Sequence, residues 1–377
     1  MPLPPVSRRR FAGALGAALG GRVLGERLSI AAEAAAAPPG AALARLDSNE
    51  NPYGPSEAAL AAMTRSEGAA CRYPDADEDA VVAALAKQHG VKPEQVVLGC
   101  GSGDVLRMAD AAFVTDGRTV VAAEPTFEAV LIHVKLTTGE GVKVPVTADF
   151  RHDLKAMAAA CDARTGLVYV CNPNNPTGTI VSGDELEAFL AAVPPATAVL
   201  VDEAYHHFVE DPAYRSMDRA LLRFPNLIVT RTFSKIYGMA GMRLGYGLAS
   251  EANAKALRAR SSFSVANTAV LAAALASLEE EALVPRQRAR LNGTRQRLCE
   301  ALSRDGRRFI PSEANFLMID VGTDVEPIIK AFRERNVAVG RKFPAMPRWL
   351  RVTIGTPEET EAFLAALRAL VPARAAA

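Results

Sequence analysis

Lys235 lies among mostly small and apolar residues in the stretch TRTFSKIYGMAGMRLGY, residues 230–246, with Arg243 eight positions later. Because an ammonium group is costly to remove from water, a lysine in such surroundings either reaches back to solvent or is bound covalently to another group. The first is the ordinary structural interpretation. The second would make Lys235 the attachment point of a bound molecule.

Two further polar motifs, CNPNNPTG (171–178) and DEAY (202–205), follow apolar runs of strand length, as TFSK (232–235) does. In open parallel sheets the carboxyl ends of the strands line the ligand crevice, so the side chains of Asn175, Asp202, Tyr205 and Lys235 could converge on one site. Taken singly, an Asn-Pro turn, a capping Asp and a core Tyr need no function. Their order and spacing together favour a shared site.

The elements that would position these residues can be predicted from hydrophobic periodicity. From Leu46 onward, strand-length apolar runs alternate with helical patterns, which predicts a parallel sheet with crossover helices. The expected strands cover 95–100, 119–124, 166–171, 197–203, 226–232 and 243–249. Beyond about Leu283, a charged helix over 285–306 and short strands over 315–321 and 349–355 indicate a separate α+β domain. Capping motifs predict helix starts at Ser182 and Thr356.

Motifs spread from Leu46 to Leu370 resemble those of fold-type I pyridoxal-phosphate enzymes, in the class I/II aminotransferases and nearest their histidinol-phosphate aminotransferase subgroup. The motifs are DSNENPYGPS (47–56), RYPD (72–75), GCGSGD (99–104), CNPNNPTG (171–178), DEAY (202–205), TFSKIYGMAGMRLGY (232–246) and WLRVTIGTPEE (349–359). The resemblance implies an α/β fold. Its large domain, over 46–282 and including an N-terminal arm, would hold a mostly parallel sheet with helices on both faces, and a smaller α+β domain would cover 283–377.

The resemblance also implies pyridoxal 5'-phosphate as the cofactor, held by Lys235 through a Schiff base. Asp202 would keep the ring nitrogen protonated, Asn175 and Tyr205 would donate to the phenolate oxygen, and Phe127 would stack on the ring. The phosphate would be bound at a helix N-terminus and by hydroxyls and a cation, from Ser102, Gly103, Asp104, Thr232, Ser234 and Arg243. Tyr73 would reach the phosphate of the neighbouring subunit, which implies a homodimer with shared active sites.

The implied reaction is transamination between a small amino donor and a 2-oxo acid acceptor, with the amine of Lys235 as general base and Asp202 and Tyr205 as its catalytic partners. The acidic group of the substrate would meet Arg351, with Arg341 and Asn51 also in the substrate site. Two alternatives stay open: a decarboxylase of the threonine-phosphate decarboxylase type, and a non-catalytic exported binding protein. The retention of Lys235 and Asp202 favours an enzyme.

Two other interpretations of local motifs are weaker. The run GCGSGD could be a dinucleotide loop, but Asp104 stands where the sixth position needs glycine. His206 and His207 could bind a metal, but adjacent residues are expected to point to opposite faces and no third ligand is near in sequence. We therefore expect no metal site.

Composition excludes several further classes of protein. The 377 residues include 43 basic and 42 acidic side chains, giving a net charge of +1, so no charge excess directs the chain to nucleic acid. The 5 cysteines form no C-x-x-C pair, which argues against a structural zinc site or a disulfide scaffold.

The N-terminal segment differs from the rest of the chain. The run SRRRFAGALGAALGG (7–21), followed by AAEAAAAP (31–38), resembles a twin-arginine export signal covering 1–37. The expected destination is the periplasm; the alternative is a disordered basic extension on a cytoplasmic protein. No other segment reaches the length of about 18 apolar residues that a membrane span needs, so none is expected in the mature chain.

Overall fold

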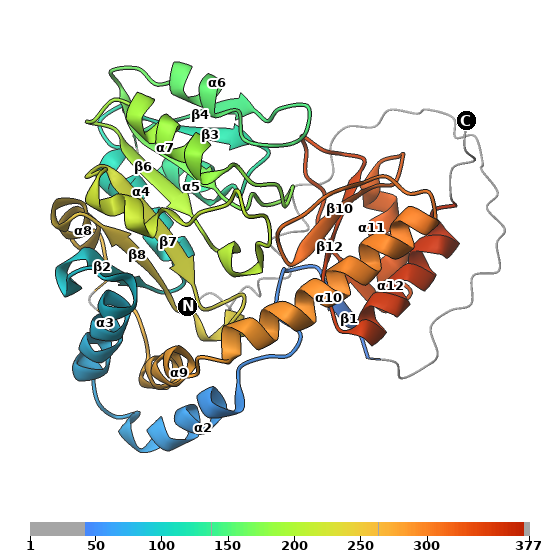
Figure 1. Ribbon diagram of the computed structural model, residues 1–377, viewed down its shortest axis with the longest axis horizontal. Coiled ribbons are helices and arrows are strands. Elements are labelled where there is room, and N and C mark those ends of the chain that lie inside the picture. Colours follow the sequence, from blue (N-terminus) through green and yellow to red (C-terminus); the bar gives the residue numbers. More distant parts are fainter. Residues whose placement is uncertain (1–41, 137, 263, 373–377) are drawn as a thin grey trace, which may run out of the picture. The chain divides into compact units, whose positions relative to one another are not determined.

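A computed structural model describes residues 42–136, 138–262 and 264–372 of the chain (Figure 1). The predicted export signal over 1–37 lies outside the described residues. Among the helices described, none is both long and apolar enough to cross a membrane.

A seven-stranded sheet in the order β2-β8-β7-β6-β5-β3-β4 forms the larger part of the structure. Its strands are β2 (Val96–Gly99), β3 (Thr119–Glu124), β4 (Glu140–Pro145), β5 (Thr165–Cys171), β6 (Ala198–Asp202), β7 (Leu227–Thr232) and β8 (Gly245–Ala249). Strand β8 runs antiparallel to both of its neighbours, and the other pairs are parallel. The mostly parallel sheet is thus confirmed with its expected strands, and β4 is an edge strand that the sequence did not reveal.

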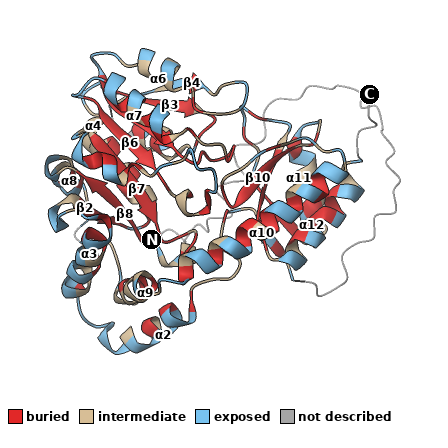
Figure 2. Cartoon of the chain, viewed as in Figure 1, coloured by how far each residue is buried: buried red, intermediate tan, exposed pale blue. Residues whose placement is uncertain are grey.

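Helices cover both faces of this sheet, as expected. The inner strands β5 and β6 are therefore buried on both sides (Figure 2). One face packs against α4 (Ser102–Phe113), α5 (Ala129–His133) and α8 (Glu251–Arg258). The other packs against α3 (Asp75–His89), α6 (Leu154–Ala159) and α7 (Gly183–Ala192). Successive residues of β6 divide between the two cores, Val199 and Val201 facing one and Leu200 the other. Because β6 packs into a core on each side, the position of its carboxyl end is fixed.

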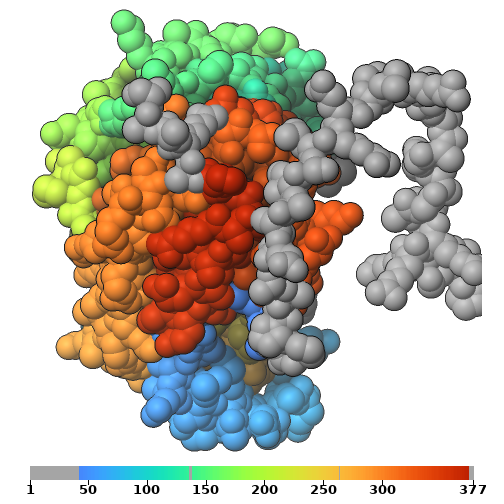
Figure 3. Space-filling view, turned by 90° about the vertical axis from the view of Figure 1, so that its right-hand side faces the viewer, coloured from blue at the N-terminus to red at the C-terminus, as the bar shows by residue number. Residues whose placement is uncertain are grey.

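The C-terminal part contains a three-stranded antiparallel sheet, in the order β12-β10-β9. It consists of β9 (Phe309–Ile310), β10 (Phe316–Asp320) and β12 (Trp349–Thr353), with helices α10 (Leu283–Arg304), α11 (Val325–Arg333) and α12 (Pro357–Leu370). Thr356 and Glu359 form the expected capping box at the start of α12, and Ser182 and Glu185 form that of α7. Figure 3 shows the face on which α10 and α12 lie side by side.

The N-terminal arm joins this C-terminal part through a strand pairing that the sequence did not predict. Strand β1 (Ala44–Leu46) pairs in parallel with β11 (Val337–Val339). The arm then passes the sheet and continues into α2 (Glu57–Ser66), which packs against α9 (Thr268–Glu279). The remaining short 3-10 segments are Glu67–Ala69, Pro93–Gln95, Val134–Leu136, His206–Phe208, Met217–Leu222 and Ala240–Met242. The β1–β11 pairing places residues 47–50 beside the carboxyl ends of the large sheet.

Candidate active site

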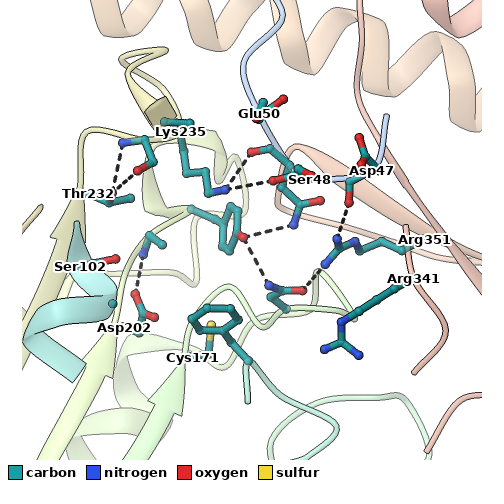
Figure 4. A pocket seen from close by; sticks show the side chains of 18 of the residues that line it. Asp47, Ser48, Glu50, Ser102, Cys171, Asp202, Thr232, Lys235, Arg341 and Arg351 are labelled. Carbon is teal, nitrogen blue, oxygen red and sulfur yellow. Dashed lines mark hydrogen bonds between the residues drawn. The ribbon is translucent and has the colours of Figure 1, made fainter. Parts of the chain in front are cut away.

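A cavity of about 700 Å³ lies at the carboxyl ends of β5, β6 and β7, between the large sheet, the arm and the C-terminal part (Figure 4). Most of the predicted site residues line it: Ser102, Gly103, Phe127, Asn175, Asp202, Tyr205, Thr232, Ser234, Lys235, Arg243, Arg341 and Arg351. The order of polar motifs in the sequence therefore does converge on one place. Asp47, Ser48, Asn49 and Glu50 of the arm complete the wall opposite the sheet.

Lys235 projects from the turn after β7 toward the arm (Figure 4). Its Nζ donates hydrogen bonds to the carbonyl oxygens of Asn49, at 3.0 Å, and Ser48, at 3.4 Å. Burial, followed by the positive charge of Arg351, lowers the pKa of Lys235 to about 8. About a tenth of the amine is therefore uncharged at pH 7, far more than for an ordinary lysine, and the uncharged form is the one that a nucleophile or general base requires.

Asp202 ends β6 as a buried carboxylate with only neutral partners. It accepts hydrogen bonds from the hydroxyl of Tyr169, at 2.9 Å, and the amide of Ala204, at 3.1 Å. Burial raises the pKa of Asp202, and no basic side chain in the described ranges forms an ion pair with it. A buried carboxylate without a cation is unfavourable, so this position favours a ligand that brings a positive charge.

The hydroxyl of Tyr205 is held by two amides. It accepts from Nδ2 of Asn49, at 3.1 Å, and from Nδ2 of Asn175, at 3.4 Å, which leaves its own proton available to an acceptor in the cavity. Arg351 is fixed beside it, donating to Oδ1 of Asn175 at 2.8 Å and to the carbonyl of Asp47 at 2.7 Å. Its Nε is buried, and none of the described residues accepts a hydrogen bond from it.

An anion cup forms where the N-terminus of α4 meets the turn after β7. Glycine is required at two positions there: a Cβ on Gly245 would lie 2.1 Å from the amide nitrogen of Ser102, and Gly101 has a φ of +81°, which other residues rarely adopt. Arg243 donates to Oγ of Ser234 at 3.3 Å, and Thr232 donates to the same oxygen at 2.9 Å. Free helix amides, hydroxyls and a guanidinium in one place are suited to a phosphate.

Three predicted residues do not line the cavity. The amide of Asp104 donates to the carbonyl of Gly101 at 3.1 Å, and its contact with the phosphate stays a prediction. The amide group of Asn51 is used within the fold, with Nδ2 donating to the carbonyl of Ile236 at 3.0 Å and Oδ1 accepting from the amide of Tyr53. Tyr73 is 80% exposed, and its contact with a neighbouring subunit stays a prediction.

The structure also adds residues that motif reasoning missed. Asn49 orients Tyr205 and accepts from Lys235, and it lies within the recognised run 47–56. Tyr169 on β5 donates a hydrogen bond to Asp202 on the neighbouring strand β6. Asp202 pairs with Cys171, and Tyr169 lies two residues before Cys171, so the pairing of these two strands is the signal that could have identified it. His206 and His207 are not on opposite faces, because they lie in a 3-10 turn in which their ring centroids are 3.7 Å apart and the rings are tilted by 36°. Within the described residues, no cluster of His, Cys, Asp and Glu is suited to a metal ion.

The fold and the cavity define a pyridoxal-phosphate enzyme of fold-type I, and sequence comparison agrees. A family model for aminotransferase class I and II matches residues 42–367, so the chain belongs to this family. It is a pyridoxal-phosphate-dependent aminotransferase of the histidinol-phosphate aminotransferase-like kind.

Several relatives support this assignment. The histidinol-phosphate aminotransferase 2 of Ralstonia nicotianae is 40% identical over 348 residues, covering 89% of this chain and 91% of the relative. The histidinol-phosphate aminotransferase 1 of Cupriavidus pinatubonensis is 42% identical, with 87% and 88% covered. The crystal structure of histidinol-phosphate aminotransferase from Sinorhizobium meliloti in complex with pyridoxal-5'-phosphate is similar with a TM-score of 0.82 and 28% identity, covering 87% of this chain and 91% of that one.

The cavity residues fit this cofactor in their donor and acceptor chemistry. The anion cup suits the phosphate, the unpaired carboxylate of Asp202 suits a protonated ring nitrogen, and the free proton of Tyr205 suits the phenolate oxygen. The amine of Lys235 suits the aldehyde carbon. When bound, the cofactor withdraws electrons from the substrate's α-carbon, which makes the proton there acidic.

The protein's own groups then divide the remaining work. Asp202 holds a negative charge at the buried end of the cavity, where its burial makes the charge effective. The neutral amine of Lys235 takes the proton from the α-carbon and returns it at the next step, as a general base of pKa about 8 can do near neutral pH. Arg351 lies across the cavity, where it can hold an acidic group and so orient the substrate.

The lowered pKa of Lys235 predicts how the cofactor-free protein reloads. Only the neutral amine attacks an aldehyde, so the rate of covalent attachment should rise with pH up to about 8 and level off above it. An ordinary lysine would instead keep gaining rate up to about pH 10.4. Stopped-flow absorbance of the lysine-bound cofactor measures this profile. A rate that still climbs tenfold between pH 9 and 10 would contradict the perturbed pKa.

Proposed function

We propose that this aminotransferase acts on an amino phosphate of the L-histidinol phosphate type and passes its amino group to a 2-oxo acid. The observation that carries the proposal is a pair of guanidinium groups on one wall of the cavity, those of Arg341 and Arg351. Their central carbons lie 4.3 Å and 5.3 Å, respectively, from the centroid of the Phe343 ring. Two adjacent guanidinium groups suit a dianion, because each can donate a forked pair of hydrogen bonds. The printed names of the relatives support the same substrate class.

The proposal is tested by comparing L-histidinol phosphate with L-histidinol, which lacks the phosphate. The wild type should prefer the phosphorylated donor, and Arg351→Ala should lower kcat/KM for that donor by about 100-fold, the usual scale for removing one partner of a buried charge pair. The value for L-histidinol should change far less. Arg348→Ala, which removes an exposed arginine paired with Asp320 outside the cavity, is the matched control. Equal losses for both donors would mean that Arg351 only supports Asn175.

We also propose that the enzyme is a homodimer in which Tyr73 of each chain reaches the partner's cofactor phosphate. The support is the exposure of two large apolar side chains in one segment of the chain, Tyr73 at 80% and Leu60 at 49%. Light scattering of the purified protein should give twice the mass of one chain. Tyr73→Phe should weaken cofactor binding, and an active monomer would contradict the proposal.

We further propose that residues 1–37 direct the folded, cofactor-loaded enzyme through the twin-arginine route to the periplasm. The support is the pattern of Arg8, Arg9 and Phe11 before a weakly apolar segment. Because the cofactor is made in the cytoplasm, a route that carries folded proteins would deliver it already bound. Changing Arg8 and Arg9 together to Lys should keep active, uncleaved enzyme in the cytoplasm. Full-length wild type in the cytoplasmic fraction would contradict the proposal.

A further inference from the structure

An ion pair between two distant segments lies beside the substrate end of the cavity. Nη2 of Arg341 and Oε2 of Glu128 are 2.5 Å apart. Glu128 precedes α5 in the large sheet region and directly follows Phe127, which lines the cavity. Arg341 follows β11 in the C-terminal part and lines the cavity from the other side. The carboxylate of Glu128 is therefore already paired with Arg341, one of the two arginines proposed to bind the substrate.

The two arginines are held very differently. Arg351 is 8% exposed and fixed by Asn175 and the arm. The side chains of Arg341 and Glu128 are 53% and 38% exposed, respectively. Ion pairs with this degree of exposure are weak and exchange readily with other ions. Arg351 is thus a fixed anchor, whereas Arg341 can change partners without breaking buried contacts. Figure 4 shows the two arginine side chains adjacent on the same wall.

We propose that Glu128 is a specificity-determining residue of the substrate site: its carboxylate is the resting partner of Arg341, and an acidic group of the substrate has to replace it there. The identity of that group as a phosphate monoester rests on the function proposed above. When the substrate's acidic group replaces Glu128 at Arg341, the negative charge of Glu128 stays close to that group. Glu128 therefore opposes anions in proportion to their charge and does not affect neutral molecules, because Coulomb repulsion scales with charge.

The test uses the cofactor-loaded enzyme and three competitive inhibitors that lack an amino group: butyramide, butyrate and propyl phosphate, with charges of zero, minus one and about minus two. In Glu128→Gln, the inhibition constant should stay unchanged for butyramide, fall roughly threefold for butyrate and fall roughly tenfold for propyl phosphate, as expected for removing one charge about 7 Å away in water. Glu124→Gln is the matched control, since Glu124 lies four residues earlier, is similarly exposed and pairs with Lys143. It should change each constant less than twofold.

A second background shows whether Glu128 acts through Arg341. In Arg341→Gln, adding Glu128→Gln should change the anion constants less than in the wild type. Weaker anion binding in Glu128→Gln would overturn the inference, since Glu128 would then position Arg341 rather than compete for it. Equal changes for the neutral and charged inhibitors, or no inhibition by either anion, would also overturn it. If only propyl phosphate fails to inhibit the wild type, the phosphate proposal falls, while butyrate still decides the role of Glu128.

Discussion

Replacing Lys235 with alanine should lower turnover by at least about 10⁴-fold, the scale seen when a group central to the chemistry is removed. The loss is large because one side chain supplies both the covalent attachment and the general base. The fold should survive, since within the described residues the side chain of Lys235 makes two hydrogen bonds, both to carbonyls of the arm. Steady-state kinetics and thermal unfolding measure the two expectations.

The control for this variant is Lys255→Ala, which removes an exposed lysine on α8 and should leave activity unchanged. Borohydride treatment followed by peptide mass spectrometry should find the cofactor on Lys235 in the wild type and on no peptide in the variant. Turnover near that of the wild type in Lys235→Ala, or cofactor attached to another lysine, would refute the assignment.

Asp202→Asn should separate catalysis from stability. The substitution keeps the shape and an acceptor for Tyr169 but removes the negative charge at the ring nitrogen. Activity should fall by about 10²- to 10³-fold, as for the loss of one preorganised electrostatic partner. Because burial raises the pKa of Asp202, its charge destabilises the cofactor-free fold at neutral pH. The cofactor-free variant should therefore melt at the same or a higher temperature.

Calorimetry of the wild type and Asp202→Asn, each with and without the cofactor, measures these differences in stability. The loaded wild type should gain more stability from the cofactor than the loaded variant does, because only the wild type pairs a carboxylate with the ring nitrogen. Tyr169→Phe is a useful companion, since it removes a single donor to Asp202 and should have a smaller effect on activity. Undiminished turnover in Asp202→Asn would exclude the carboxylate from catalysis.

The parts of this site that the sequence predicts are those encoded locally. A buried strand followed directly by a polar residue places that residue at the sheet edge, which is how Asp202 and Lys235 could be recognised. Contacts between distant segments leave no such local pattern. The pairing of Glu128 with Arg341 and the orientation of Tyr205 by Asn49 both depend on tertiary packing. Asn51 shows the converse, because the side chain of this motif residue bonds the backbone of Tyr53 and of the distant Ile236 instead of facing the cavity.

The strands that the sequence predicts are likewise those with a local signal. The inner strands were apparent because burial on both faces makes them continuously apolar. Strand β4 is an edge strand in which Glu140, Gly141, Lys143 and Pro145 are exposed, so its sequence lacks that signal. Strand β1 has three residues and is defined only by its partner β11.

The pairing of β1 with β11 has a consequence for the order of folding during synthesis. Ala44 is among the first of the described residues to leave the ribosome, but its partner Val337 is among the last. Until β11 emerges, the arm cannot dock, and the carbonyl oxygens of Asn49 and Asp47 are not yet presented to Lys235 and Arg351. Contacts between such distant positions form late, because closing a long loop is entropically unfavourable. The active site is therefore completed only when nearly the whole chain has been translated.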